Sequence, residues 1–304
     1  MVALGGSMKD EQDQAHLTGL EATPSSSEST PRDVIRWAVD LAGHAPSLYN
    51  AQPWSWQVGD NRADLFMDLS HSFPVTDPDN REMRIACGAA LHHLQVALAA
   101  AGWRCELERS SGLDGGFLAR VRLTEHCGID QNALQLVKAI PHRHTDRRPF
   151  SIQRVSPEVL AALQACADTD GVHLQIVTRD EHRIWLSVLT DRAAALQSAQ
   201  EGYLDELARA TGAYDTSAGV PANVVPHVVS PRHSDVTLRD FELLQPGTLG
   251  ITESVVQSQP VEIPMIRAQL NEHLLSGLGH AQVLVRVGWA GSSDAELPTS
   301  PRRS

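Results

Sequence analysis

Hydrophobic and polar positions follow two periods along this chain, one typical of helices and one typical of strands. In residues 33–41 the apolar side chains lie three or four positions apart, which predicts an amphipathic helix. Residues 63–69 and 117–124 instead alternate in steps of two, as half-buried strands do. Between these strands, the apolar run 83–101 predicts a long buried helix. Helices and strands are therefore mixed in the first part of the chain.

A second series of helices and strands is predicted beyond the middle of the chain. Ser156 and Pro157 are typical of a helix start, because serine caps the first turn and proline fits its first position, and this helix is expected to reach Ala167. The further expected elements are a short strand at 172–178, a long helix at 181–211 and a strand at 280–290. Because strands and helices do not alternate strictly, we predict an α+β protein with two similar halves, 31–140 and 141–304.

Two segments show neither period. Residues 1–30 are polar and rich in serine and glutamate, which predicts a flexible N-terminal tail. Residues 213–250 are rich in glycine, proline, serine and valine, and a stretch of this length is typical of a lid, a binding loop or a disordered region. The second half has no counterpart of the helix expected at 88–102, which indicates that a segment near Gly250 is missing from this chain.

Composition and charge argue against two classes of protein. Of the 304 residues, 42% are apolar and 20% are charged, as in ordinary soluble globular proteins. The net charge of −12 argues against a nucleic-acid binder, since a polyanion would be repelled by most of the surface. The most apolar run, 85–102, contains His92, His93 and Gln95, which favours a buried helix over a membrane span.

The cysteines and the N-terminal residues both indicate the cytoplasm. Cys87, Cys105, Cys127 and Cys166 are spread over separate segments without CxxC spacing, so we expect reduced thiols. Cys87 and Cys166 fall in apolar, helix-like runs, where a thiol behaves as a small hydrophobic group. Residues 1–12 have neither a basic region nor a long apolar region, so no secretory signal is predicted.

Because the chain is acidic, a place where arginines gather is a candidate anion site. Residues 142–148 (HRHTDRR) hold three arginines and two histidines around one acid. Arg143, Thr145 and Arg147 alternate, so an extended backbone places their side chains on one side. Two guanidinium groups and a hydroxyl suit a phosphate dianion, which accepts several charge-assisted hydrogen bonds. The alternative is a solvated basic turn, the usual explanation of a charge run.

The same segment offers a pair of histidines with the spacing of metal ligands, His142 and His144. The neighbouring arginines would repel a divalent cation, and no cysteine or glutamate lies nearby to complete a ligand set. The sequence therefore predicts no metal site.

A second constellation is the loop at 45–54, with the sequence APSLYNAQPW. Two prolines bracket it, Trp54 and Trp56 are expected to anchor it in the core, and its short polar side chains could present dipoles to a ligand. These polar side chains belong to Ser47, Asn50 and Gln52. A capped turn above buried tryptophans is the structural alternative. Ser47 has no GxSxG context, which argues against a hydrolase nucleophile.

Together these motifs resemble those of FMN-dependent nitroreductases. The loop at 45–54 is similar to the early loop of that family, and residues 143–147 (RHTDR) are similar to the RRSxR element that holds the FMN phosphate. Ordinary nitroreductases carry both elements in one short chain and pair two chains. Here the first half carries only the loop, and the second half begins with the RRSxR-like element. This arrangement resembles the Acg family of mycobacterial nitroreductase-like proteins, whose members are fused and dimer-like.

The resemblance implies a nitroreductase-like pseudo-dimer that binds one FMN at one complete site, so that a homodimer is not required. His144 replaces the second arginine of RRSxR, and the basic residues of the C-terminus could be a frayed tail or close the phosphate site. The positions implied to contact the cofactor are Ser47, Asn50, Gln52, Arg143, His144, Thr145, Arg147, Arg302 and Arg303. No catalytic residue near the flavin ring is identified.

Three functions are compatible with a flavin-like site. The resemblance implies an oxidoreductase that uses NAD(P)H to reduce nitroaromatic or quinone-like acceptors, in a family associated with stress and dormancy responses. The second possibility is an FMN-sequestering or storage protein, whose lid at 213–250 blocks the flavin and prevents turnover. The third is a binder of phosphate esters or nucleotides that takes no flavin at all.

Overall fold

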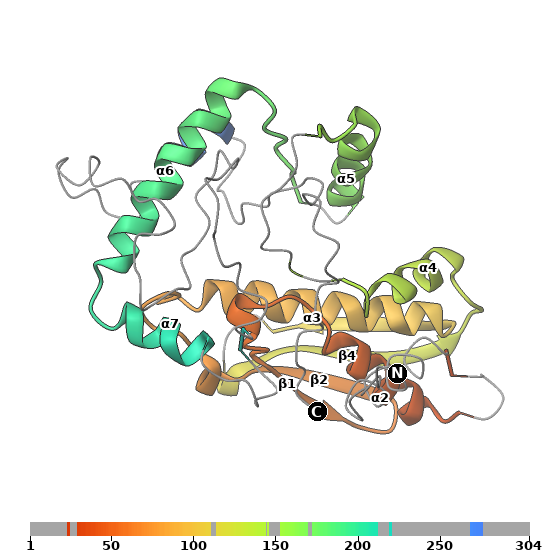
Figure 1. Ribbon diagram of the computed structural model, residues 1–304. Helices are drawn as coiled ribbons and strands as arrows, with labels where there is room; N and C mark the ends of the chain where they lie inside the picture. Colours follow the sequence, from red (N-terminus) through yellow and green to blue (C-terminus); the bar gives the residue numbers. More distant parts are fainter. Residues whose placement is uncertain are drawn as a thin grey trace, which may run out of the picture. The chain divides into compact units, whose positions relative to one another are not determined.

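The computed structural model describes residues 23–24, 29–110, 114–143, 145, 153–169, 172–211, 219–220 and 268–275. The chain divides into two compact units, and Figure 1 colours it from red to blue along the sequence. The first unit contains the described residues up to Thr145, together with 209–211 and 219–220. The second contains 153–169, 172–208 and 268–275.

The first unit contains a four-stranded antiparallel sheet. Its strands are β1 (Trp54–Val58), β2 (Arg62–Met67), β3 (Trp103–Arg109) and β4 (Phe117–His126), in the order β1-β2-β4-β3. The strands predicted at 63–69 and 117–124 are confirmed as β2 and β4. In both strands every second side chain is buried on the face that carries Leu65 and Val121.

Two helices, α2 (Pro31–Ala42) and α3 (Arg81–Ala100), pack against that apolar face of the sheet. A third helix, α4 (Gln131–Ala139), packs against α3, which therefore contacts both of the others (Figure 1). The helices predicted at 33–41 and 83–101 are therefore confirmed. The start of α2 is fixed by Thr30, whose hydroxyl accepts the N–H of Asp33 while the Asp33 carboxylate accepts the N–H of Thr30.

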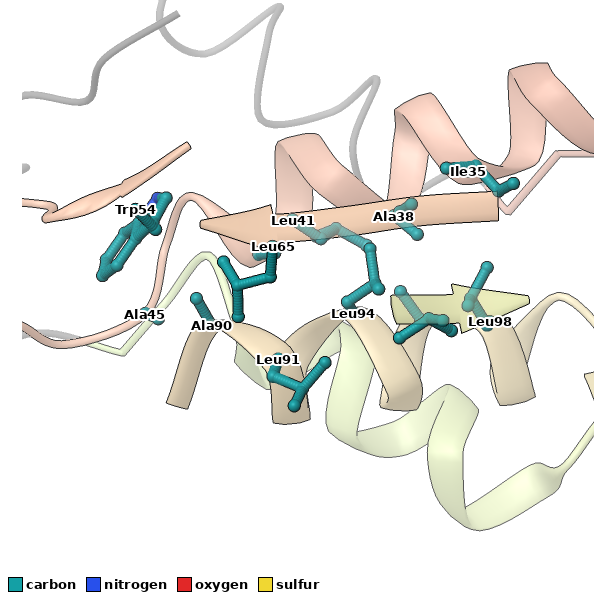
Figure 2. Packing of buried hydrophobic residues seen from close by; sticks show 14 of the residues in the cluster. Ile35, Ala38, Leu41, Ala45, Trp54, Leu65, Ala90, Leu91, Leu94 and Leu98 are labelled. Carbon is teal, nitrogen blue, oxygen red and sulfur yellow. The ribbon is translucent and has the colours of Figure 1, made fainter. Parts of the chain in front are cut away.

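The core of this unit lies between α2, α3 and β2. Figure 2 shows Leu41 of α2, Leu65 of β2 and Leu94 of α3 pointing into a common space. Each of the three is at most 1% exposed. Trp54 is buried beside them, whereas Trp56 is only half-buried. The expectation that the tryptophans anchor the 45–54 loop in the core is thus met fully by Trp54 and partly by Trp56.

Short helical turns connect these elements. They are η1 (Leu48–Asn50), η2 (Leu69–His71) and η3 (Asp114–Gly116). The first of them lies inside the 45–54 loop and directly precedes β1. The sheet therefore fixes one end of the loop, and the C-terminal end of α2 fixes the other.

The described residues of the second unit are helical or irregular. Its elements are α5 (Pro157–Thr169), α6 (Asp180–Ser198), α7 (Tyr203–Thr211), whose last turn belongs to the first unit, and the single turn η6 (Asn271–Leu275). The helix predicted from Ser156 is confirmed as α5. The structure shows an α+β protein with an antiparallel sheet, and the internal similarity of two halves stays a prediction.

Two predictions in the second unit are wrong. Residues 172–178 form irregular chain where a strand was expected, and within the part of the unit that is described no strand pairs with them. An isolated strand leaves its backbone groups unpaired, so apolar alternation alone does not produce one. The helix expected over 181–211 is interrupted between Ser198 and Tyr203, and in this break Gly202, directly before α7, adopts a left-handed φ of +83°.

The four cysteines are free thiols, as predicted, but they differ in burial. Cys87 is fully buried in α3, which confirms its role as a small core side chain. Cys166 is exposed on α5, so the expectation that it packs in a core is wrong. Among the helices of the described residues, none has the length and apolar character needed to span a membrane.

Three further expectations lie wholly or mostly outside the described residues. They concern the strand at 280–290, the lid-like segment 213–250 (of which 219–220 are described) and most of the tail 1–30. The helix α2 begins at Pro31, directly after the predicted tail.

Candidate functional site

The structure places Arg143, the first residue of the RHTDR element, beside the residue that precedes the 45–54 loop. Arg143 follows α4 after three intervening residues, and its Nη2 donates a hydrogen bond of 3.1 Å to the carbonyl of His44, which lies 99 residues earlier and directly before that loop. Ala133 and Val137 bury one side of α4 in the core, and Ile140 and Pro141 are buried just beyond it. Packing of α4 therefore determines where Arg143 lies.

The electrostatic surroundings of Arg143 are unusual for a cation. Its Nε is buried and has no hydrogen-bond partner, and burial lowers the pKa of the guanidinium. Within the described part of the chain, no carboxylate forms an ion pair with it. A buried charge without a counter-charge is costly, and an unsatisfied donor adds to that cost. A bound anion would supply both the missing counter-charge and an acceptor for the unpaired Nε.

The loop beside Arg143 has a strained backbone. Tyr49, Asn50 and Gln52 have φ values of +51°, +57° and +49°. Asparagine tolerates this left-handed conformation, but it is uncommon for tyrosine and glutamine. Such conformations persist only where surrounding contacts hold them, and they are frequent at binding sites.

Ser47 shares a hydrogen bond within this loop. Its half-buried Oγ accepts the backbone N–H of Gln52 at 2.9 Å. Since the oxygen is an acceptor in that bond, the hydroxyl proton remains available for donation to an oxygen atom of a ligand. Ser47 is therefore suited to donate to a phosphate or a hydroxyl.

Asn50 and Gln52 differ in their access to a ligand. Gln52 is only 1% exposed, and its Nε2 donates to the carbonyl of Asn50 at 3.3 Å. The N–H of Gly219 donates to the same carbonyl, also at 3.3 Å. Gln52 thus stabilises the loop from inside, whereas Asn50 is half-buried at its surface. The assignment of Gln52 to the cofactor stays a prediction.

The remaining predicted site residues are less completely described. Thr145 is exposed, two residues beyond Arg143. Four others lie outside the described residues: His144, Arg147, Arg302 and Arg303. In the part of the chain that is described, no three His, Cys, Asp or Glu side chains are grouped to hold a metal ion.

The N-terminus of α3 could otherwise attract an anion, but its first N–H groups are already hydrogen-bonded within the protein. The carboxylate of Asp77 accepts the N–H groups of Arg81, Glu82 and Met83 at 2.8, 3.1 and 3.1 Å. Asp77 is 4% exposed and fills the first turn of α3 from four residues before it. The sequence motifs did not reveal this cap, because the position directly before the helix is Asn80, whose side chain does not cap it.

Tyr49 and His44 were also missed from sequence. Tyr49 is buried and packs edge-on against Phe73, with ring centroids 5.0 Å apart at an interplanar angle of 79°. His44 takes part through its backbone carbonyl, which no side-chain motif can indicate. The sequence offered one signal for Tyr49, its position directly before Asn50 in a loop bracketed by prolines.

An open groove of about 340 Å³ lies on the outer face of the sheet, and its lining residues belong neither to the 45–54 loop nor to the RHTDR element. It is lined by Glu106, Leu107, Glu108, Arg120 and Arg122. Arg120 is engaged there by the buried Asp64, with hydrogen bonds of 2.7 and 3.0 Å. None of the groove residues belongs to the predicted site.

The chain is similar to several curated proteins, although no family model matches it. It is 32% identical over 311 residues to “Putative NAD(P)H nitroreductase Rv3131” of Mycobacterium tuberculosis, covering 89% of each chain. It is 35% identical over 215 residues to “Putative NAD(P)H nitroreductase acg” of the same species, covering 70% of this chain and 64% of that protein. “Probable NAD(P)H nitroreductase PigM” of a Serratia species is 28% identical over 179 residues, covering 57% and 50%.

These relatives include the Acg protein itself, and the first of them matches nearly the whole chain. Arg143, which helped to carry the resemblance in the sequence, is hydrogen-bonded to His44, the residue directly before the 45–54 loop. The chain therefore belongs to the nitroreductase family, as a relative of the mycobacterial Acg protein.

Proposed function

We propose that this protein binds FMN and uses NAD(P)H to reduce nitroaromatic or quinone-like acceptors. The observation that supports this most strongly is the half-buried Arg143, whose Nε is buried without a hydrogen-bond partner and which has no counter-charge among the described residues. A phosphate monoester supplies two negative charges and several acceptor oxygens. It is therefore the kind of ligand that this cation requires.

Several residues of this chain would hold the cofactor. Arg143 would pair with the phosphate, Ser47 would donate its free hydroxyl proton, and Asn50 would present its side chain from the left-handed turn. Thr145 and Arg147 would extend the phosphate contacts, with His144, Arg302 and Arg303 as further donors. When bound, FMN supplies the two-electron redox chemistry, and the protein supplies position and electrostatics.

The reductase assignment follows the names of the relatives, which describe NAD(P)H nitroreductases. The wider organisation follows the sequence: two nitroreductase-like halves in one chain, one complete flavin site and a cytoplasmic protein that does not require a homodimer. In this proposal, residues 31–140 contribute the loop, and the segment that begins at 141 contributes the phosphate-binding arginines.

The deciding experiment combines a spectrum with a reduction assay. The purified full-length protein is incubated with FMN, passed over a desalting column and examined in the visible range, then mixed anaerobically with NADH or NADPH. We expect a yellow protein whose flavin band bleaches quickly and returns when a nitroaromatic or a quinone is added. Because the relatives' names leave the nicotinamide open, both donors are compared at equal concentration.

Other outcomes would overturn one part of the proposal or all of it. A yellow protein reduced by dithionite but by neither nicotinamide would establish a sequestering protein instead of a reductase. A protein that stays colourless with excess FMN would exclude the flavin, and a phosphate ester of another kind would then be the ligand to seek.

A further inference from the structure

The strained turn at Tyr49 and Asn50 needs a physical cause. Two successive residues adopt left-handed conformations there, and one of them is a bulky aromatic residue. A tyrosine in this region of the Ramachandran plot is unfavourable by itself, so contacts of its side chain must compensate. The Tyr49 ring is 5% exposed, which places it among the buried side chains of the first unit.

The contact that can provide this compensation is the edge-to-face pair of Tyr49 and Phe73. Their ring centroids are 5.0 Å apart at 79°, a favoured geometry in which the positive edge of one ring meets the negative face of the other. Such a pair holds a ring in a fixed direction better than a plain apolar contact does. The backbone at Tyr49 is thereby held in its left-handed conformation.

Phe73 is itself fixed by the start of α3. Its carbonyl accepts the N–H of Asp77 at 2.7 Å, and the carboxylate of Asp77 accepts three backbone N–H groups of that helix. A continuous series of contacts therefore runs from the rigid helix through Asp77 and Phe73 to Tyr49. The turn that follows Tyr49 carries Asn50, and Ser47 lies on its other side.

We propose that Tyr49 and Phe73 form a positioning pair for the phosphate of the bound flavin, a role that rests on the proposed FMN function. The pair holds the left-handed turn that carries Asn50, in the loop that follows His44, whose carbonyl accepts the hydrogen bond from Arg143. Neither ring touches the phosphate. Their effect is confined to the geometry of the loop, so it concerns the phosphate end of the ligand and leaves the flavin ring unaffected.

The test compares two ligands that differ only in the phosphate. Dissociation constants for FMN and for riboflavin are measured by fluorescence quenching for the wild type and for Phe73→Leu, and their ratio reports what the phosphate contributes. We expect the preference of the wild type for FMN to fall by about three- to tenfold in Phe73→Leu, in line with the worth of an aromatic pair. Riboflavin affinity is expected to stay unchanged.

Three variants provide the controls. Phe117→Leu breaks a second edge-to-face pair of the unit, Phe66 with Phe117 at 5.5 Å on the sheet, and should leave the ratio unchanged. Phe73→Tyr keeps the ring and should retain the wild-type ratio. If Phe73→Leu does not fold, Tyr49→Leu removes the other ring and carries the same expectation.

The outcomes separate the positioning role from the FMN function itself. A wild type that binds FMN and riboflavin equally well, or binds neither, overturns the proposed function and the positioning pair together. A wild type that prefers FMN, with the same preference in the folded Phe73→Leu or Tyr49→Leu variant, overturns the positioning pair alone. Equal losses of FMN and riboflavin affinity would show a general structural role and also contradict the proposal.

Discussion

Arg143 donates a hydrogen bond of 3.1 Å from Nη2 to the backbone carbonyl of His44, and this bond joins two segments that lie 99 residues apart in the chain. Arg143 begins the RHTDR element, and His44 directly precedes the APSLYNAQPW loop. A single neutral acceptor does not compensate the charge of a half-buried guanidinium whose Nε is buried without a partner. The same bond that holds Arg143 in place therefore leaves its charge available to a ligand.

Arg143→Met should weaken FMN binding without weakening the fold. The methionine side chain keeps the length and the packing of the arginine stem but removes the charge. We expect a loss of about 1.5–3 kcal/mol in FMN affinity, the usual worth of a hydrogen bond to a charged group. The flavin-free protein should be at least as stable as the wild type towards urea, because an uncompensated buried charge has been removed.

The matched control for Arg143 is an arginine at the surface. Arg122 is exposed on β4, and Arg122→Met should change neither the FMN affinity nor the midpoint of urea unfolding by a measurable amount. Unchanged flavin affinity in Arg143→Met would contradict the phosphate assignment. A strong loss of stability in the flavin-free variant would show that Arg143 has a structural partner.

Asp77 should contribute to stability as the cap of α3. Its carboxylate satisfies three N–H groups that otherwise have no partner in the helix. Asp77→Ala is expected to lower the free energy of unfolding by about 1–2 kcal/mol, as measured by urea denaturation. Asp79→Ala, two residues away at an exposed position, should have little effect, and equal effects of the two substitutions would refute the capping role.

Asp64 and Arg120 should make stability depend on pH. The hydrogen bonds from Arg120 lower the pKa of the Asp64 carboxyl below its ordinary value of 3.8. The ionised carboxylate therefore stabilises the folded protein at any pH above about 4, and this contribution is lost as the pH falls through the lowered pKa. At pH 7, Asp64→Asn should melt at a lower temperature than the wild type.

The difference between Asp64→Asn and the wild type should shrink steadily as the pH is lowered from 5 towards 2. Thermal melts monitored by circular dichroism at several pH values test this. A control is Asp60→Asn, which changes an exposed carboxylate in the turn before β2. A difference between Asp64→Asn and the wild type that stays constant with pH would show that the packing of the side chain matters and its charge does not.

The elements that the sequence predicted correctly are those with long and regular apolar periods. The spacing of apolar residues identifies α2, the alternation in steps of two identifies β2 and β4, and the long apolar run identifies α3. The strand β3 was missed, although its charged residues alternate with Trp103, Cys105 and Leu107. The helix α4 is only nine residues long and buries just Ala133 and Val137, too few for a clear period.

The sequence allowed the side chains of the candidate site to be predicted, but not the backbone geometry that positions them. Arg143 and Ser47 could be identified from their motifs, because guanidinium and hydroxyl groups suit a phosphate. The acceptor for Arg143 is a main-chain carbonyl, and every residue has one, so no motif pointed to His44. The left-handed turn depends on a contact between Tyr49 and Phe73, which are 24 residues apart, and local sequence does not encode such a contact.

The thiols should differ widely in reactivity, with Cys87 the least reactive. Burial raises its pKa to about 12, and its Sγ donates a hydrogen bond of 3.3 Å to the carbonyl of Pro53. At pH 8 roughly one molecule in ten thousand carries the Cys87 thiolate, which is the nucleophilic form. We expect iodoacetamide to modify the exposed Cys127 and Cys166 in the native protein, the half-buried Cys105 more slowly, and Cys87 only after unfolding in urea.

Peptide mass spectrometry after timed alkylation measures each of these rates separately. Cys127→Ser and Cys166→Ser serve as controls, because each should abolish one fast modification and leave the protection of Cys87 intact. Since Cys87 packs directly beneath the start of β1, its protection also reports whether the 45–54 loop stays closed over the core. Modification of Cys87 at the rate of Cys127 in native buffer would show that this part of the core opens readily, and it would contradict the fixed loop on which the candidate site depends.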